Sequence, residues 1–214
     1  MSLAGALMAV IWTGVTLYAV LGGADFGGGI LHLLASGDAA EREREAITDA
    51  MGPVWEANHV WLIFVLTGLL SAFPRAFGAL GTAVFLPGTL ALVAIVVRGA
   101  ALALCSPIAG RPGARVSAQR LFGAASVAAP FLLGVIAGEL ARRGAARTGQ
   151  PVHWLGPLQL VVGALAAVLC VAVAAVFLTV EAARAGKAEL AAGFRRRGLQ
   201  ATAAAGVLAL AGLA

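Results

Sequence analysis

The fold is decided by one long apolar stretch, residues 3–34, which reads LAGALMAVIWTGVTLYAVLGGADFGGGILHLL. A helix needs about 20 apolar residues to cross the hydrocarbon core of a membrane. This stretch is longer and is apolar on every side, whereas a membrane-spanning strand would alternate in polarity over about 10 residues. We therefore predict a transmembrane helix here. Because no charged leader precedes it, we expect it to be a retained span and not a cleaved signal peptide.

The rest of the chain repeats this pattern in five further apolar runs. They lie at about Trp55–Phe73, Phe77–Leu104, Leu121–Leu140, Leu155–Val180 and Gly198–Ala214. The composition agrees, because 61% of the 214 residues are hydrophobic and only 12% are charged, about half the charged share of a typical soluble domain. We predict an all-α, polytopic transmembrane helix bundle with about six spans. Residues 1–140 should form a four-helix bundle, and residues 141–214 the start of a second, incomplete one.

Lysine and arginine residues in the loops predict how the helices are oriented. The first, third and fifth loops hold Arg42, Arg44, Arg111, Arg115, Arg120, Arg184, Lys187, Arg195, Arg196 and Arg197. The second and fourth loops hold Arg75, Arg142, Arg143 and Arg147. Because cytoplasmic loops are enriched in cations, we expect the odd-numbered loops inside the cell and the N-terminus outside. This distribution also explains the pI of about 10.6 without a nucleic-acid partner, because no soluble basic face is available for a phosphate backbone.

The first loop should contain a short cytoplasmic surface helix near residues 41–50. Asp38 can cap its first turn, with Glu41 three residues later as the reciprocal partner. Gly52 and Pro53 follow, and a proline inside a helix removes a backbone donor and clashes with the preceding turn. We therefore expect this helix to end before the second span begins.

Four of the ionisable residues within or at the ends of apolar runs carry the site prediction, because charge is costly there and such side chains usually face a protein interior or water. They are Asp25, Glu56, His59 and Arg98. The predicted topology places Asp25, Glu56 and Arg98 at similar depth on the cytoplasmic side. This predicts a shared polar site in which Arg98 pairs with a carboxylate. Simpler explanations stay open: an acid at a frayed helix end, a glutamate favoured by the helix dipole and a snorkelling arginine.

The remaining polar and small residues are assigned structural roles. We expect Glu139 to be an interfacial charge, His32 and His153 to be solvated or capping, and Cys105 and Cys170 to be small packing residues. Gly23 with Gly27, and Gly134 with Gly138, have the GxxxG spacing that permits close helix contacts. The sequence contains no recognisable nucleophile triad, phosphate-binding loop or metal-binding cluster.

Several segments together resemble one known family. They are GADFGGG at residues 23–29, PVWEANHVWL at residues 53–62, Ala72-Phe73-Pro74, Arg98, Ala129-Pro130 through Gly134, and the tail from Glu181 to Arg197. The resemblance covers nearly the whole chain, and the segment at residues 53–62 is its most specific part. The family is subunit II of cytochrome bd-type terminal quinol oxidases.

The resemblance implies a noncatalytic subunit of an oxidase in the bacterial inner membrane. The partner, subunit I, would carry three haems and the quinol site, while this chain would hold no haem, metal or catalytic residue. The complex would oxidise quinol, reduce dioxygen to water and take its protons from the cytoplasm. Asp25 and Glu56 would be proton-path acids, His59 a further candidate relay, and Arg98 their charge partner. Membrane lipid or quinone would be a further partner.

Two departures and two alternatives accompany this interpretation. Family members usually have about eight spans, and His59 stands where a neutral polar residue is expected; it could relay protons or, less readily, ligate a haem. A small proton- or cation-coupled transporter would also use intramembrane acids and glycine-interrupted helices. A purely structural membrane scaffold is the third possibility.

Overall fold

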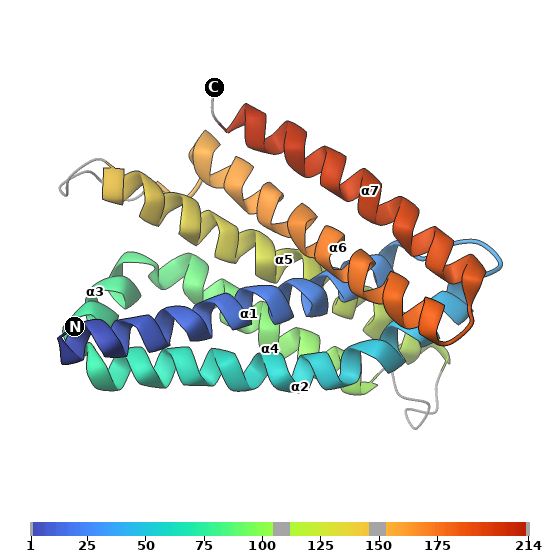
Figure 1. Cartoon of the computed structure of the whole chain (residues 1–214), viewed down its shortest axis with the longest axis horizontal. Helices are drawn as coiled ribbons and strands as arrows, with labels where there is room; N and C mark the ends of the chain where they lie inside the picture. The colour runs from blue at the N-terminus through green and yellow to red at the C-terminus, as the bar shows by residue number, and fades with distance from the viewer. Residues whose placement is uncertain (1, 105–111, 146–152, 213–214) are drawn as a thin grey trace.

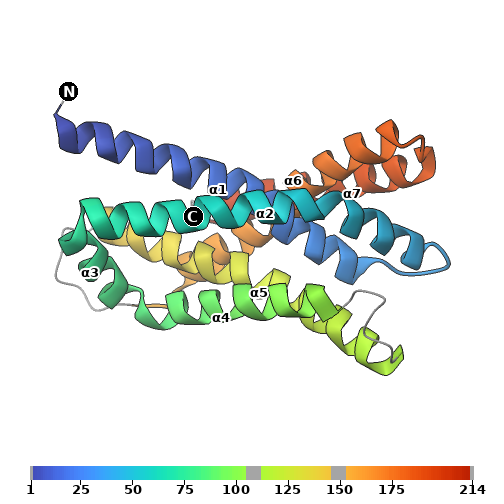
Figure 2. The same cartoon turned by 90° about the horizontal axis from the view of Figure 1, so that it is seen from below.

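The computed structural model describes residues 2–104, 112–145 and 153–212, and every regular element in these ranges is a helix. The helices are α1 (Leu3–Leu34), α2 (Ala40–Ala72), α3 (Pro74–Ala83), α4 (Phe85–Leu104), α5 (Pro112–Ala145), α6 (Pro157–Arg184) and α7 (Ala188–Ala211). They form an elongated bundle in which α1 packs against α2, α5 and α6, while α7 lies at one edge along α6 (Figures 1 and 2). The predicted all-α bundle is confirmed. The expectations for Cys105, Arg111 and Arg147 lie outside the described residues.

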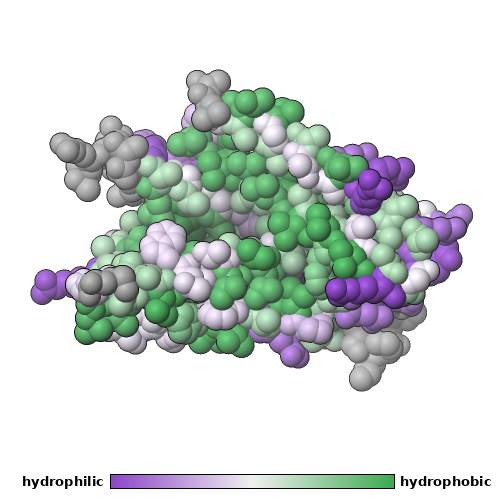
Figure 3. Space-filling view, in the orientation of Figure 1, coloured by the Kyte–Doolittle hydropathy of each residue, from purple (hydrophilic) through white to green (hydrophobic). Residues whose placement is uncertain are grey.

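Five of the described helices are long and apolar enough to cross a membrane: α1, α2, α4, α5 and α6. Helix α7 covers most of the sixth expected run, but every window of 18 residues within it contains Arg195, Arg196 and Arg197. The expectation of about six spans therefore agrees roughly with five such helices and an α7 that is apolar mainly in its second half. Hydrophobic side chains cover the middle of the bundle, and hydrophilic ones gather toward its ends (Figure 3).

Helix α2 does not stop where the sequence suggested. It runs without a break through Gly52 and Pro53, so the expected end of a separate surface helix before the second span was wrong. The expected Asp38 cap is also absent, because Ala39 occupies the N-cap position without a side-chain hydrogen bond. Met51 and Val54 on either side of the proline are buried. Their burial in the bundle favours a continuous helix despite the backbone bond that the proline removes.

The third apolar run is divided into two helices. Helix α3 ends at Ala83, and α4 begins at Phe85, with Val84 between them in a non-helical conformation (φ −110°, ψ 19°). No residue of α3 is buried, and the span by length and composition is Phe85–Ala103. The expected start at Phe77 was therefore too early. Because the whole stretch is apolar, hydrophobicity alone could not show where α3 ends and α4 begins.

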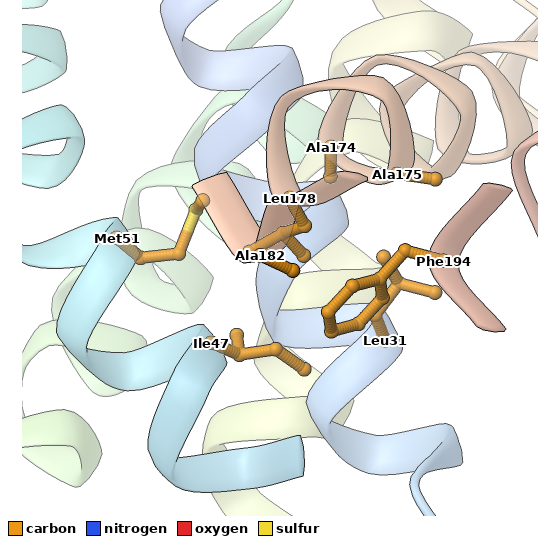
Figure 4. Packing of buried hydrophobic residues seen from close by; sticks show 8 residues of the cluster. All are labelled: Leu31, Ile47, Met51, Ala174, Ala175, Leu178, Ala182 and Phe194. Atoms are coloured by element: carbon orange, nitrogen blue, oxygen red, sulfur yellow. The ribbon is translucent and has the colours of Figure 1, made fainter. Parts of the chain in front are cut away.

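Side chains from four helices close the end of the bundle where α1 joins α2 and α6 joins α7. The buried cluster consists of Leu31, Ile47, Met51, Ala174, Ala175, Leu178, Ala182 and Phe194 (Figure 4). Glu43 of α2 forms a two-bond ion pair with Arg197 of α7 beside it. Arg44 donates to the backbone carbonyl of Ala35, 2.7 Å away. The α1–α2 and α6–α7 connections, which are the first and fifth loops of the sequence analysis, therefore lie at the same end of the bundle.

Candidate functional site

An ion pair joins α1 to α4 in the interior of the bundle. Nη2 of Arg98 lies 2.6 Å from Oδ1 of Asp25, and Nη1 lies 3.0 Å from Oδ2. Nη2 also donates to the backbone carbonyl of Asp25 at 2.9 Å. The side chains of Asp25 and Arg98 are 0% and 1% exposed. A planar guanidinium facing a carboxylate with two parallel bonds is the strong, directional form of this interaction, and it compensates both buried charges.

Two neutral residues complete the hydrogen bonding of this pair. Asn58 of α2 donates from Nδ2 to Asp25 Oδ2 at 3.2 Å. Ser126 of α5 accepts from Arg98 Nε at 2.9 Å and donates to the Phe122 carbonyl at 2.7 Å. Four helices thus contribute to one site. We call Asp25, Asn58, Arg98 and Ser126 the polar cluster.

Aromatic rings flank the guanidinium of the polar cluster. The Arg98 guanidinium carbon lies 4.9 Å from the ring centroid of Phe122 and 5.4 Å from that of Phe26. Cations within about 6 Å of an aromatic face are attracted by its quadrupole. The rings also exclude lipid and water from this side of the arginine, so its position is fixed by packing as well as by charge.

Glycine residues of α1 allow the other helices to come this close. A Cβ atom at Gly27 would overlap with the backbone carbonyl of Cys170 in α6, and one at Gly29 would overlap with the Ser126 hydroxyl in α5. Gly134 of α5 is similarly crowded by Val162 of α6. The GxxxG spacings therefore do mark close helix contacts at Gly27 and at Gly134. The contact at Gly29 lies one turn from Asp25 on the same face of α1 and brings Ser126 to the polar cluster.

The other two site residues predicted from the sequence lie apart from the polar cluster. Glu56 is exposed on α2, and no side chain in the described ranges hydrogen-bonds or pairs with it. Asn58 occupies the place beside Asp25 that the sequence suggested for Glu56. Successive helical residues differ by about 100°, so positions 56 and 58 face nearly opposite sides of α2. The structure thus brings together Asp25 and Arg98, but not Glu56.

His59 is half-buried at the side of α2. Its Nδ1 lies 2.8 Å from the Trp55 carbonyl, and its ring lies 4.8 Å from that of Trp55 between centroids. A carbonyl oxygen can only accept, so Nδ1 carries the hydrogen in this contact. In the neutral ring, Nε2 is then the nitrogen that can take up a proton. His59 and Glu56 are three residues apart, so both side chains lie on the same side of α2.

The sequence interpretation missed a second buried carboxylate. Glu139 is 1% exposed; its Oε1 lies 2.7 Å from Arg142 Nη2, and Gln159 Nε2 donates to its Oε2 at 2.6 Å. His32 is also buried, with its ring edge-on to Phe122 at 5.4 Å between centroids, so the expectation that it is solvated was wrong. Gln159 in the first turn of the next apolar run was the available signal for the Glu139 contact.

The arrangement places acidic, basic and imidazole side chains on neighbouring helices. Within the described ranges, no group of three or more His, Cys, Asp or Glu side chains could hold a metal ion. The His32 ring packs edge-on against Phe122. His59 donates from Nδ1 to the Trp55 carbonyl, which leaves Nε2 as its acceptor nitrogen. The chemistry available is that of carboxylate, imidazole and guanidinium groups at the edge and in the interior of a membrane bundle.

Comparison with known proteins gives consistent relatives. A cytochrome bd ubiquinol oxidase subunit 2 of Bacillus subtilis is 29% identical over 130 residues, which cover 61% of this chain and 37% of that protein. A second relative from the same organism is 29% identical over 91 residues, or 26% of its length. The solved structure of the bd oxidase from Geobacillus thermodenitrificans contains a chain with the same fold, at a TM-score of 0.74 and 22% identity.

The matches cover a larger share of this chain than of the proteins it resembles. The structural match covers 97% of this chain and 65% of the solved chain, so the chain spans less than two thirds of the proteins that it resembles. The family model of cytochrome bd terminal oxidase subunit II, in contrast, matches residues 3–214. This range includes all the described helices and every residue of the polar cluster. The chain therefore belongs to the cytochrome bd terminal oxidase subunit II family.

Proposed function

We propose that this chain is a noncatalytic membrane subunit of a terminal quinol oxidase that reduces dioxygen to water. The observation that carries the proposal is the family match over residues 3–214. Its partner would be subunit I, holding the haems and the quinol site, in the inner membrane of a bacterial cell.

Within that complex, the proposed role of the chain is to support assembly and to supply protons from the cytoplasm. Glu56 is the proposed entry group, because its carboxylate is exposed on a membrane helix and is not engaged by the described part of the chain. His59, with Nε2 able to accept a proton, is the proposed neighbour. Asp25 is the proposed interior acid, and Arg98 its charge partner. A proton-coupled transporter would use similar groups, but membership of the oxidase subunit family does not favour that alternative.

The two acids differ in what a neutral replacement would disturb. Asp25 accepts hydrogen bonds from both Arg98 and Asn58, so Asp25→Asn would leave a buried guanidinium without its counter-charge. Glu56 has no such partner in the described ranges. Glu56→Gln therefore removes the titrating group with little effect on packing, which makes it the cleaner test of proton supply.

We expect the Glu56→Gln complex to assemble with normal haem content and to consume oxygen at least about tenfold more slowly per haem, since positioned proton-transfer groups contribute about 10²–10⁴ in rate. Glu56→Asp should retain more activity because it keeps a carboxylate. Glu189→Gln, an exposed acid at the start of α7, is the matched control and should be fully active. Full haem-normalised turnover in Glu56→Gln would end the proposed role of this residue.

A further inference from the structure

The imidazole of His59 is held with one nitrogen engaged and the other left as an acceptor. Nδ1 donates to the Trp55 carbonyl at 2.8 Å, so the neutral ring carries its lone pair on Nε2. The ring also packs on the Trp55 indole, with centroids 4.8 Å apart and 56° between the planes. A histidine that binds a metal ion almost always donates its other N–H to a carbonyl or a carboxylate, which fixes the tautomer and the ring orientation. His59 has this arrangement from its own helix.

Glu56 brings a carboxylate to the same side of α2. It is exposed, three residues before His59, and not engaged by the described part of the chain. Side chains at this spacing have Cβ atoms about 5–6 Å apart, and helical side chains lean back toward the preceding turn. The contact of His59 with the Trp55 carbonyl shows this lean, so the imidazole lies over the turn that carries Glu56. A Glu-x-x-His pair on one helix is a motif that holds metal ions in ferritin-like helix bundles.

The charges along α2 favour a cation at this pair. Residues 45–74 contain no lysine or arginine. The nearest charged residue along the helix is Asp49, an exposed acid about two turns before Glu56 on the same face. In the interior, the charge of Arg98 is compensated by its ion pair with Asp25. A divalent ion at Glu56 and His59 would therefore meet negative charge on its own helix.

The two donor groups favour zinc over magnesium and calcium. Mg²⁺ and Ca²⁺ prefer oxygen ligands, whereas Zn²⁺ binds imidazole nitrogen and carboxylate oxygen at about 2.0–2.2 Å. Within the described ranges, no third His, Cys, Asp or Glu side chain joins the pair. Water would complete the coordination, so the ion would exchange with the solution and would not be a resident cofactor. Because both protein ligands must be deprotonated to bind the ion, zinc would exclude protons from Glu56 and from His59 Nε2.

We propose that Glu56 and His59 form a binding site for Zn²⁺, and that zinc inhibits the oxidase there by taking the place of protons. The site follows from the two residues themselves, whereas the inhibition rests on their proposed role in proton supply. Trp55 is a positioning residue, because its carbonyl and its ring hold the imidazole.

Binding is tested by equilibrium dialysis of the purified oxidase complex against radioactive Zn²⁺. Glu56→Gln and His59→Gln should each weaken one zinc site by at least about tenfold, since even the loss of an outer-shell partner costs about 10–100-fold in metal affinity. The controls are Glu189→Gln and His153→Gln, which remove an exposed acid and an exposed histidine elsewhere. Both should bind zinc like the wild type. Identical zinc binding by the wild type and both site variants would overturn the site.

Inhibition is tested by oxygen consumption per haem at increasing free Zn²⁺, with each variant compared to its own zinc-free rate. We expect zinc to inhibit the wild type and EDTA to restore its turnover. The half-inhibiting concentration should rise at least about tenfold in His59→Gln and stay unchanged in the two controls. Zinc bound at the pair without any loss of turnover would overturn the inhibition.

The two measurements separate this site from the proposed function. If Glu56→Gln is slow but binds zinc like the wild type, the zinc site is wrong and the proton-supply role stands. If Glu56→Gln loses zinc binding but keeps full turnover, the zinc site stands and the proton-supply role of Glu56 fails.

Discussion

At the scale of single residues, one ion pair in the described ranges has both partners buried, whereas Glu139 and Glu43 are buried against more exposed arginines. Asp25 and Arg98 are both almost fully buried, and together with Asn58 and Ser126 they use hydrogen bonds from four helices. Removing one partner of a buried pair leaves an uncompensated charge, whereas removing both can be nearly neutral. The pair therefore makes the fold sensitive to either single replacement.

Arg98→Met should destabilise the protein by about 3–5 kcal/mol, because the Asp25 carboxylate stays buried without its counter-charge. Asp25→Asn/Arg98→Met should recover at least half of that loss. Arg75→Met, at an exposed arginine, should change stability by less than about 0.5 kcal/mol. Equilibrium unfolding in mixed detergent micelles measures all three. A double variant as unstable as Arg98→Met would contradict an energetic coupling between the two charges.

The sequence was sufficient to identify Asp25 and Arg98, because charge is rare and costly in apolar runs. It was not sufficient to choose between Glu56 and Asn58 as their neighbour. Both stand at similar depth on α2, and only the rotation of that helix decides which one faces α1. Ser126 had no sequence signal at all, because a serine in a small-residue stretch usually serves packing. Its role depends on the close contact at Gly29.

At the scale of helices, small residues set how closely the elements approach. The contact between α1 and α6 depends on Gly27, where an added Cβ would overlap with the Cys170 carbonyl. Because a backbone atom cannot move aside as a flexible side chain can, one methyl group must push the helices apart. Asp25, two residues earlier, faces nearly the opposite side of α1, so the shift acts on the α1–α6 contact itself.

Gly27→Ala should therefore lower stability by at least about 1–3 kcal/mol, as overpacking of a tight interior does. Gly206→Ala, at an exposed position of α7, is the matched control, because a Cβ there would meet nothing within 4 Å. It should be neutral or stabilising by up to about 1 kcal/mol, since alanine favours helix over glycine. Thermal unfolding of the two variants in one detergent decides the matter. Equal stability for both variants would mean that α1 and α6 can move apart at little cost, and would contradict the prediction.

Helix positions were predictable from hydrophobicity, but helix ends were not. The apolar runs marked all five candidate spans, yet α2 begins at Ala40 and α3 separates from α4 at Val84. Pro53 predicted a helix boundary, because proline removes a backbone hydrogen bond and clashes with the preceding turn. The helix nevertheless continues through this position, where Met51 and Val54 are buried in the bundle. The bend at Val84 interrupts an apolar stretch, where no change in hydrophobicity could indicate it.

At the scale of the whole molecule, the charges and the packing agree on two ends of the bundle. The Glu43–Arg197 pair joins the start of α2 to α7, and Arg44 binds the end of α1. The first and fifth loops therefore share one end, as the positive-inside prediction requires. Glu139 and Arg142 lie toward the opposite end, near the C-terminus of α5. The division into two bundles at residue 140 stays a prediction.

A cysteine placed at the exposed Arg42 should be protected from a membrane-impermeant maleimide in intact cells, because this end is predicted to face the cytoplasm. A cysteine at Leu155, which is 81% exposed at the other end, should react. Both belong in a background in which Cys105 and Cys170 are serine. After cell lysis the Arg42→Cys variant should label fully. Reaction of Arg42→Cys but not Leu155→Cys in intact cells would reverse the orientation.

The central claim is that the chain works as one subunit of a haem-bearing quinol oxidase. The most direct measurement is the visible absorption and the quinol-dependent oxygen consumption of the complex purified through a tag on this chain. We predict that a second, haem-bearing subunit copurifies with it, and that the same fraction shows haem absorption and consumes oxygen when quinol is added. A colourless, inactive homo-oligomer, isolated under mild detergent from cells with active respiration, would contradict the account.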